Sequence, residues 1–321
     1  MKHLKSILAF LKDAFLAAKK YTIGTASASM ELLLKAALEG AKVFKNLEYS
    51  KVQGQSLLLD LFMPGDAKEK LPLIVWLHGG GWTSGDKENC PVLFFIKMGY
   101  AVASINYRLS PQAVFPAQIQ DCKASIRFLR ANAVEYNIDP DHIGVWGGSA
   151  GGHLAALMGV SDGIMELEGN GGNPSMSSRV QAVCDFFGPT DFTVFKDLRL
   201  TKDLKVEEKL KDFHLANDVV TKFLGVPVEQ NTEKAEQASP ITYVKKIRAD
   251  KKDFPPFLIM HGDKDPVVPV EQSITFHDAL KTAGFDSSLH VYKGAKHGYL
   301  GGDSLKVVEN FFKKTLKNLK S

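Results

Sequence analysis

Cysteine is scarce in this chain, and the three that occur form no metal-binding or disulfide pattern. Cys90, Cys122 and Cys184 are far apart among 321 residues, odd in number, and outside any C-x-x-C spacing. Small disulfide scaffolds need paired cysteines, and zinc modules need cysteines or histidines at close, regular intervals. The pattern therefore argues against a disulfide framework and predicts no structural metal site.

The sequence also lacks the long apolar runs, charge clusters and nucleotide-binding motifs that mark several other functional classes. No segment has the roughly 20 apolar residues that a membrane-spanning helix needs. The net charge of +4 comes from lysines and arginines spread along the chain, whereas nucleic-acid binding favours a clustered basic face. P-loop, G-x-G-x-x-G dinucleotide and H-E-x-x-H zinc motifs are missing. We therefore expect no cofactor, no metal and no nucleic-acid partner.

The first 45 residues are predicted to form a helical segment outside the main domain. In residues 1–20, apolar side chains recur at helical spacing, while Lys12 and Asp13 interrupt the apolar run that an export signal needs. This pattern indicates an amphipathic helix that packs on its own protein, on a second copy in a homo-oligomer, or on a membrane surface. Residues 26–44 are predicted to form a second helix. Without a convincing export signal, we expect a cytoplasmic location.

Residues 46–321 are predicted to form one α/β domain. After a hairpin around Gly54, buried apolar runs alternate with amphipathic segments. This alternation is typical of a mostly parallel, doubly wound sheet with helices on both faces. Residues 189–240 are charged and show no buried strand, so we expect an insertion that caps the site. The predicted strands cover residues 45–52, 56–63, 73–77, 101–105, 143–146, 180–187, 257–260 and 287–292.

A candidate nucleophile lies in residues 147–151, Gly-Gly-Ser-Ala-Gly, which fit the G-x-S-x-G nucleophile elbow. An apolar strand precedes this pentapeptide and a helical segment follows it. A serine on so sharp a turn sits in strained backbone, and flanking glycines avoid the clash that a Cβ would cause. The N-terminal end of the following helix favours negative charge near the serine. The pattern therefore predicts Ser149 as the nucleophile.

An acid and a histidine follow the serine in the order that α/β-hydrolases use. Asp263 and Asp265 both come after a buried strand, and Asp265 lies further into the loop. We predict that Asp265 orients the base and that Asp263 bonds nearby backbone in a turn. His297 follows the last predicted strand in a glycine-bounded loop, whereas His290 lies within that strand. His297 is therefore the predicted general base.

Donors for a negatively charged oxygen are predicted in a glycine-rich loop. The sequence His-Gly-Gly-Gly-Trp at residues 78–82 follows a buried strand. Glycine lets backbone N–H groups approach a substrate carbonyl oxygen, and HGGG-type loops accompany the nucleophile elbow. We predict oxyanion roles for the N–H groups of Gly80, Gly81 and Ala150. Trp82 is predicted either to line the substrate pocket or to belong to the core.

Six motifs together resemble those of the α/β-hydrolase esterases. They are HGGGW (78–82), NYRLSP (106–111), FPAQIQD (115–121), GGSAGGH (147–153), HGDKDPVVP (261–269) and KHG (296–298). The set is most similar to the branch of bifunctional feruloyl/acetyl-xylan esterases and their hormone-sensitive-lipase-like relatives. The resemblance covers about residues 46–321 and implies the α/β-hydrolase fold and ester hydrolysis through an acyl-enzyme. It implies the same catalytic and oxyanion residues as the sequence order does.

The predicted function is that of a serine carboxylesterase acting on short-chain or carbohydrate-linked acyl esters, acetyl or feruloyl. Its substrate would be a small-molecule or oligosaccharide ester. Charged residues in the insertion favour a small acyl pocket over the broad apolar lid of a lipase. Two alternatives are an arylformamidase-type amide hydrolase, which shares the HGG-W loop, and a hydrolase-fold receptor that binds without turnover. Such receptors often lack the histidine that this chain keeps.

Overall fold

The computed structural model describes residues 37–196, 217–246, 253–298, 300–301 and 303–317. The amphipathic helix predicted in residues 1–20 lies outside them, as do most of the second predicted helix and the most charged part of the insertion. None of the helices in the described ranges has the length and apolar character needed to cross a bilayer.

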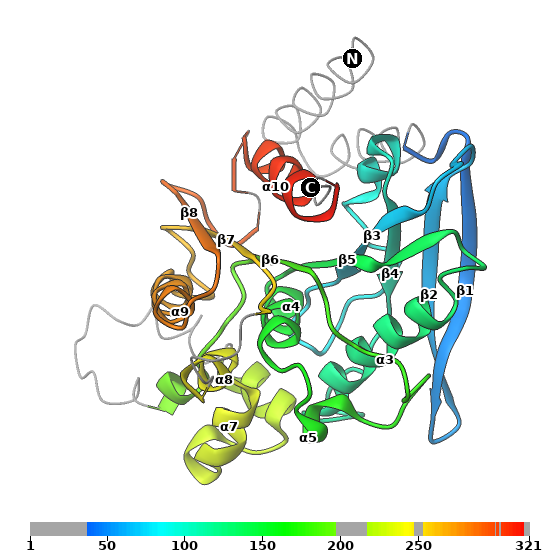
Figure 1. The fold of residues 1–321 in the computed structure, drawn as a ribbon. Coiled ribbons are helices and arrows are strands. Elements are labelled where there is room, and N and C mark those ends of the chain that lie inside the picture. The colour runs from blue at the N-terminus through cyan, green and yellow to red at the C-terminus, as the bar shows by residue number, and fades with distance from the viewer. Residues whose placement is uncertain (1–36, 197–216, 247–252, 299, 302, 318–321) are drawn as a thin grey trace, which may run out of the picture.

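Among the described residues, eight strands form one mixed sheet in the order β1-β2-β4-β3-β5-β6-β7-β8 (Figure 1). β1 pairs antiparallel with β2, and β2 with β4, while β4 to β8 pair parallel. This confirms the predicted α/β-hydrolase architecture with a mostly parallel sheet. The strands are Ala41–Val52 (β1), Gln55–Pro64 (β2), Leu71–Leu77 (β3), Ala101–Ile105 (β4), Ile138–Gly148 (β5), Ala182–Phe186 (β6), Phe257–Gly262 (β7) and Ser287–Tyr292 (β8).

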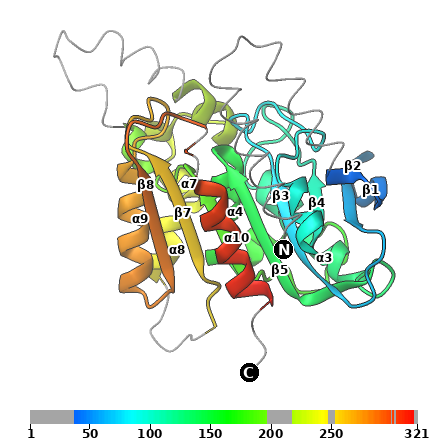
Figure 2. The same ribbon diagram turned by 90° about the horizontal axis from the view of Figure 1, so that it is seen from above.

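Helices cover both faces of the sheet (Figure 2). Helices α3 (Ala117–Ala131), α4 (Ala150–Val160) and α9 (Glu271–Thr282) pack on one face. The 3₁₀ helix η1 (Leu93–Met98) and α10 (Ser304–Phe312) pack on the other. Covered from both sides, β4 is buried at every residue, which explains its continuous apolar sequence. The shorter elements are α5 (Met165–Glu168), η2 (Thr193–Lys196), η5 (Val228–Gln230), α7 (Thr232–Ala238), α8 (Pro240–Lys246) and η6 (Lys313–Lys317).

The first strand, β1, includes residues that the sequence predicts to be helical. The sequence predicts a helix over residues 26–44, but residues 41–44 belong to β1 and pair with residues 61–64 of β2. Gly40, at φ +70°, turns the chain just before this strand. The helical prediction is wrong here because strand pairing overrides a local apolar spacing that also fits a helix. The predicted boundary after residue 45 thus falls within β1, and the division into two segments stays a prediction.

The hairpin predicted around Gly54 is present. Val52 pairs with Gln55, so only Gln53 and Gly54 form the turn, with φ of 50° and 84°. A two-residue turn with both φ values positive follows the right-handed twist of the strands. The hairpin therefore adds an antiparallel edge to the parallel sheet.

The predicted insertion, residues 189–240, is helical in its described parts and shows no strand there. Helix α8, which follows it, packs on α4 and α9 (Figure 1). Val219 and Val220 from the insertion line the cavity at Ser149. The insertion thus contributes to the cavity wall, whereas its role as a cap stays a prediction.

Candidate active site

The nucleophile elbow joins β5 to α4. Ser149 has φ 57° and ψ −120°, a strained conformation, and its N–H donates to the Phe186 carbonyl oxygen at 2.8 Å. A Cβ on Gly147 would lie 2.2 Å from the Gly151 backbone, and one on Gly151 would lie 2.0 Å from the Leu77 carbonyl oxygen. Both glycines are therefore required by close backbone approach, as the motif predicts.

Ser149, His297 and Asp265 form a continuous hydrogen-bonded relay. His297 Nε2 lies 2.9 Å from Ser149 Oγ, and His297 Nδ1 lies 2.7 Å from Asp265 Oδ2. The edge-on ring of Phe187, with its centroid 4.7 Å away, packs against the imidazole. With the hydrogen on Nδ1 facing the carboxylate, Nε2 is the acceptor for the serine hydroxyl. The structure thus brings together the three residues that the sequence predicts.

The Asp265 carboxylate is covered from solvent and accepts several hydrogen bonds. Its Oδ1 accepts the N–H groups of Val267 and Val268 at 2.8 and 3.0 Å, and its Oδ2 accepts from His297. Burial raises the pKa of Asp265, but hydrogen bonds from His261, His297 and Val268 outweigh it and hold that pKa below its usual range. The carboxylate therefore stays ionised beside the imidazole.

Asp263, the competing acid, faces another part of the chain. Its Oδ1 accepts the N–H of Gly294 at 2.6 Å, which ties the turn after β7 to the turn after β8. Asp263 therefore bonds backbone, but the prediction of a nearby partner is wrong, because Gly294 lies in the turn after β8. Of the two aspartates, only Asp265 is hydrogen-bonded to His297.

A second imidazole, His261, supports Asp265 and was not singled out by the sequence. Its Nε2 lies 2.9 Å from the Val268 carbonyl oxygen and 3.2 Å from Asp265 Oδ2. Its Nδ1 lies 2.7 Å from Ser273 Oγ, and the residue has no exposed surface. Because a carbonyl oxygen only accepts, Nε2 must carry the hydrogen and Nδ1 accepts from the serine hydroxyl. The sequence offers one indication of this role, because His261 is the first residue of the HGDKDPVVP motif and lies at the end of a buried strand.

The glycine-rich loop passes directly beside the nucleophile. A Cβ on Gly79 would lie 3.6 Å from Ser149 Cβ. Gly80 and Gly81 have φ of 107° and 57°, and a Cβ on Gly80 would lie 2.3 Å from the Ser84 carbonyl oxygen. The close approach to Ser84 therefore requires glycine at position 80, whereas the oxyanion role of the loop stays a prediction. Ala150 begins α4, where backbone N–H groups have no partner within the helix.

Trp82 belongs to the core, because it is 3% exposed, and it also lines the cavity at Ser149. Its contact with a substrate stays a prediction. Its ring stacks on Phe223 at 4.2 Å, and its Nε1 donates to His153 Nδ1 at 3.2 Å. His153 Nε2 lies 2.8 Å from the Ala238 carbonyl oxygen. Burial lowers the pKa of His153 to about 4, so the ring is neutral at pH 7. This histidine of the GGSAGGH motif, which lies on α4, links the glycine-rich loop to α7.

The Ser149 hydroxyl opens into an apolar cavity of about 570 Å³. This volume is in the range of small-molecule sites, and its walls suit an acyl chain. The lining residues are Trp76, Gly79, Gly80, Gly81, Trp82, Thr83, Gly148, Ser149, Phe187, Pro189, Val219, Val220, Val267, Val268 and His297.

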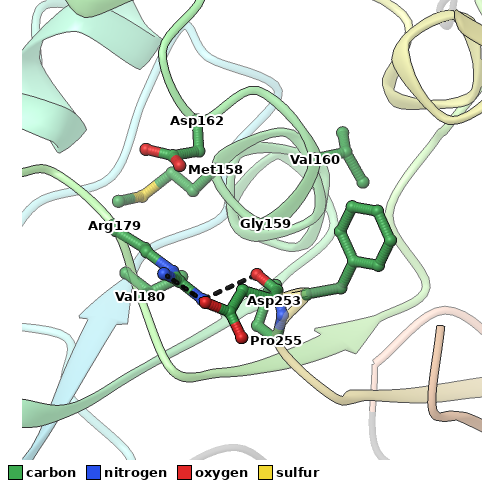
Figure 3. Close-up of a pocket in the computed structure, with 9 residues that line it drawn as sticks. Met158, Gly159, Val160, Asp162, Arg179, Val180, Asp253 and Pro255 are labelled. Atoms are coloured by element: carbon green, nitrogen blue, oxygen red, sulfur yellow. Dashed lines mark hydrogen bonds and ion pairs between the residues drawn. The ribbon is translucent and has the colours of Figure 1, made fainter. Parts of the chain in front are cut away.

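Another hollow, at the far end of α4, is far too small for a substrate. Figure 3 shows it between Met158, Asp162 and Val180, with Arg179 reaching Asp253. The Arg179 guanidinium donates to the Asp253 carbonyl oxygen at 2.6 Å. The space of about 10 Å³ holds one water molecule at most. Within the described residues, no group of three or more metal-binding side chains lies together.

Curated relatives of this chain are esterases. Esterase LipQ of Mycobacterium tuberculosis is 34% identical over 236 residues, 72% of this chain and 51% of that protein. The isoprenylcysteine alpha-carbonyl methylesterase ICME of Arabidopsis thaliana is 28% identical over 243 residues, 74% of this chain and 53% of that protein. The chain therefore spans about half the length of the curated relatives it matches.

Solved structures and a family model agree with this similarity. A truncated carbohydrate esterase from gut microbiota is 32% identical with a TM-score of 0.71, covering 86% of this chain and 97% of that one. The esterase Est2 of Thermogutta terrifontis is 26% identical with a TM-score of 0.67, covering 88% and 96%. The BD-FAE family model matches residues 59–280. With this match across more than half its length, the chain belongs to the BD-FAE family of α/β-hydrolase-fold proteins.

Proposed function

We propose that this protein is a serine carboxylesterase that hydrolyses short-chain or carbohydrate-linked acyl esters. The observation that carries the proposal is the relay from Ser149 Oγ through His297 to Asp265, with distances of 2.9 and 2.7 Å. The relay opens into an apolar cavity bounded by the glycine-rich loop. In the proposed roles, Ser149 is the nucleophile, His297 the base and Asp265 the orienting acid, and the glycine-rich loop provides oxyanion donors. These are the four parts that acyl transfer needs.

In the proposed reaction, Ser149 Oγ attacks the ester carbonyl carbon while His297 Nε2 accepts the hydroxyl proton. The carbonyl oxygen becomes negatively charged and accepts the N–H groups of Gly80, Gly81 and Ala150. Each such donor contributes about 2.7–4 kcal/mol to the transition state. The imidazolium then protonates the departing alcohol, leaving the acyl group on Ser149. Water attacks this acyl-enzyme in the same way, with His297 as base, and releases the carboxylic acid.

Solved structures of a similar esterase support the proposal of a short acyl group. Solved structures of the Thermogutta terrifontis esterase, 26% and 27% identical to this chain, are described as butyrate-bound and propionate-bound. The valines and Phe187 of the cavity offer an apolar wall for such a chain. Once a pocket is full, a further methylene stops gaining the roughly 0.8 kcal/mol of burial and begins to overpack. We therefore expect the highest kcat/KM for acyl groups of about two to four carbons.

The alternatives differ in what they predict for turnover. A receptor would bind an ester without cleaving it, and the short distance between His297 and Ser149 weighs against that reading. An arylformamidase would cleave N-formylkynurenine faster than acetyl esters.

The homo-oligomer and the cytoplasmic location expected from the sequence stay predictions.

The proposal is tested by Ser149→Ala with a chromogenic acetyl ester as substrate. The wild-type chain should hydrolyse the ester, and the variant should lose this activity while keeping its circular dichroism spectrum. Activity within tenfold of wild type would exclude Ser149 as the nucleophile. Parallel assays with N-formylkynurenine, acetylated xylan and feruloyl esters identify the preferred class.

A further inference from the structure

One short segment contacts both the nucleophile and the base. β6 lies between β5 and β7 in the sheet (Figure 1), and residues 185–188 at its end form what we call the β6 turn. The Phe186 carbonyl oxygen in this turn accepts the Ser149 N–H at 2.8 Å. The Phe187 ring contacts the His297 imidazole. The position of the β6 turn therefore affects both partners of the proposed proton transfer.

Hydrogen bonds fix the backbone of the β6 turn. The Phe187 N–H donates to the Met260 carbonyl oxygen on β7 at 2.9 Å. The Gly188 N–H donates to Asp185 Oδ1, also at 2.9 Å. Phe187 has φ 45°, a left-handed conformation that is costly for a bulky side chain and persists only where the surroundings determine it. The backbone therefore sets the direction of the Phe187 ring.

The Phe187 ring packs between the base and the residue before the nucleophile. Its centroid lies 4.7 Å from that of His297, with 61° between the two planes, a favourable geometry for an aromatic pair. A Cβ on Gly148 would lie 3.4 Å from Phe187 Cζ, so the tip of the ring is close to this glycine. Because Phe187 is only 7% exposed, its ring has little room to move.

The main chain that carries His297 has few hydrogen bonds of its own. The Ala295 carbonyl oxygen accepts the Lys264 N–H at 2.9 Å, two residues before the histidine. Within the described part of the chain, residues 296–298 make no backbone–backbone hydrogen bond. The position of the imidazole therefore depends on the contacts of the His297 side chain itself.

Two hydrogen bonds alone leave an imidazole one freedom. The bonds at Nε2 and Nδ1 of His297, to Ser149 and Asp265, act along the ring plane. They allow the ring to tilt about the line that joins the two nitrogens. A contact outside that line opposes the tilt, and Phe187 makes such a contact. Alignment matters here, because misplacing a reacting group by about 1 Å can lower a rate about 10²-fold.

We propose that Phe187 is a positioning residue for the base: its ring, fixed by the β6 turn, keeps the His297 imidazole aligned between Ser149 and Asp265. The proposal rests on the esterase function argued above. Phe187 takes no part in proton transfer and acts through His297. Because the same turn binds the Ser149 N–H, it holds the nucleophile and the base in register with each other.

Phe187→Leu tests this role with p-nitrophenyl acetate and p-nitrophenyl butyrate as substrates. Leucine keeps an apolar side chain but has no ring. We expect kcat/KM to fall about tenfold to a hundredfold, by the same factor for both esters, because a misaligned base slows every acyl group alike. A residue that only lines the cavity would change the two esters unequally. Phe187→Gly, which suits the positive φ, should lose at least as much, so the test does not depend on how leucine fits the turn.

A proton NMR signal reports the alignment without turnover. The proton on His297 Nδ1, which faces Asp265 Oδ2 at 2.7 Å, should resonate far downfield. It is assigned by its loss in His297→Ala, which keeps the His261 proton near the same carboxylate. In Phe187→Leu the signal should broaden or disappear, because a tilting ring exchanges this proton with water faster.

Phe285→Leu is the matched control, because Phe285 is a buried ring that stacks on Phe254 at 4.0 Å, outside the cavity at Ser149. This variant should keep both kcat/KM values and the downfield signal. An equal loss in the control, a loss on one ester only, or an unchanged signal in both Phe187 variants would overturn the positioning role. Wild-type chain that cleaves neither ester would instead contradict the esterase function, and the positioning role with it.

Discussion

Two covered aspartates, one on β6 and one in the loop after β7, differ in the direction in which their pKa values are shifted. Asp185, on β6, has no exposed surface; one oxygen accepts the Gly188 N–H at 2.9 Å, and the other has no hydrogen-bond partner among the described residues. Burial raises its pKa to about 7. Asp265, after β7, has a covered side chain too, but four groups donate to it and its pKa lies below the usual range. The number of donors therefore decides which carboxylate stays charged.

This difference fits the proposed role of Asp265 as the acid that orients His297. A carboxylate that orients an imidazole must be negative when the imidazole takes up a proton. Asp185 lies below the elbow, where a Cβ on Gly152 would come within 2.4 Å of its Oδ1. A pKa raised to about 7 lowers the negative charge that Asp185 places near the first turn of α4, where the proposed oxyanion would form.

The largest effect is expected for Asp265→Asn. An amide in place of the carboxylate donates a hydrogen to His297 Nδ1 and stabilises the wrong tautomer, so that Nε2 can no longer accept from Ser149. The corresponding change in the serine-protease triad lowers kcat by about 10⁴, and we expect a similar loss. Steady-state kinetics on a chromogenic acetyl ester measure it. A loss below about tenfold would show that Asp265 does not orient the base.

His261→Leu should have a smaller effect. It removes one donor to Asp265 Oδ2, and a hydrogen bond to a charged group is worth about 1.5–3 kcal/mol. We expect kcat to fall about tenfold or more with KM unchanged. His261→Gln, which keeps an N–H at similar reach, should recover part of the loss. Equal kcat values for the leucine and glutamine variants would assign His261 a packing role only.

Asp185→Asn should change stability with pH. In the wild-type chain, the unfolded state loses the Asp185 proton above about pH 3.8, while the folded state keeps it until about pH 7. The free energy of unfolding therefore falls as the pH rises between these values and stays lower above them. The variant cannot ionise, so this contribution, on the order of a few kcal/mol, should vanish. Urea unfolding at pH 5 and pH 8 measures it; identical pH dependence in both proteins would contradict the raised pKa.

The smallest effect is expected for Asp263→Asn. This carboxylate accepts only a backbone N–H from Gly294 in the described contacts, and an amide oxygen accepts the same bond. We expect kcat/KM within about twofold of wild type. If this variant lost more activity than Asp265→Asn, the assignment of the two aspartates would be reversed.

The sequence predicted the parts of the site that local constraints determine. Gly147 and Gly151 lie where another backbone segment comes too close for a Cβ, and the motif indicates this. Ser149 and His297 each follow a strand, so their positions in the sequence relative to the predicted strands identify them as candidates. The mostly parallel sheet follows from the alternation of apolar runs with amphipathic segments. These features depend on nearby residues, which explains why the motifs predict them.

Contacts between distant segments could not be predicted in the same way. His153 contacts Trp82 and Ala238, and His261 contacts Ser273, through the fold alone. The strand over residues 41–44 forms because β2 pairs with it, against a helical local pattern. The cavities also depend on the packing of distant segments. Trp82 is buried in the core and also lines the cavity at Ser149, and the local sequence does not predict this combination.

The central claim, that Ser149 is an activated nucleophile, is tested most directly by covalent labelling. In diethyl p-nitrophenyl phosphate, Ser149 Oγ would attack phosphorus, His297 would take the proton and p-nitrophenolate would leave. We predict one diethylphosphoryl group per chain, located by peptide mass spectrometry on Ser149, with loss of esterase activity in proportion to labelling. Ser149→Ala should take up none. Full labelling with activity retained, or labelling of another residue in step with inactivation, would contradict the claim.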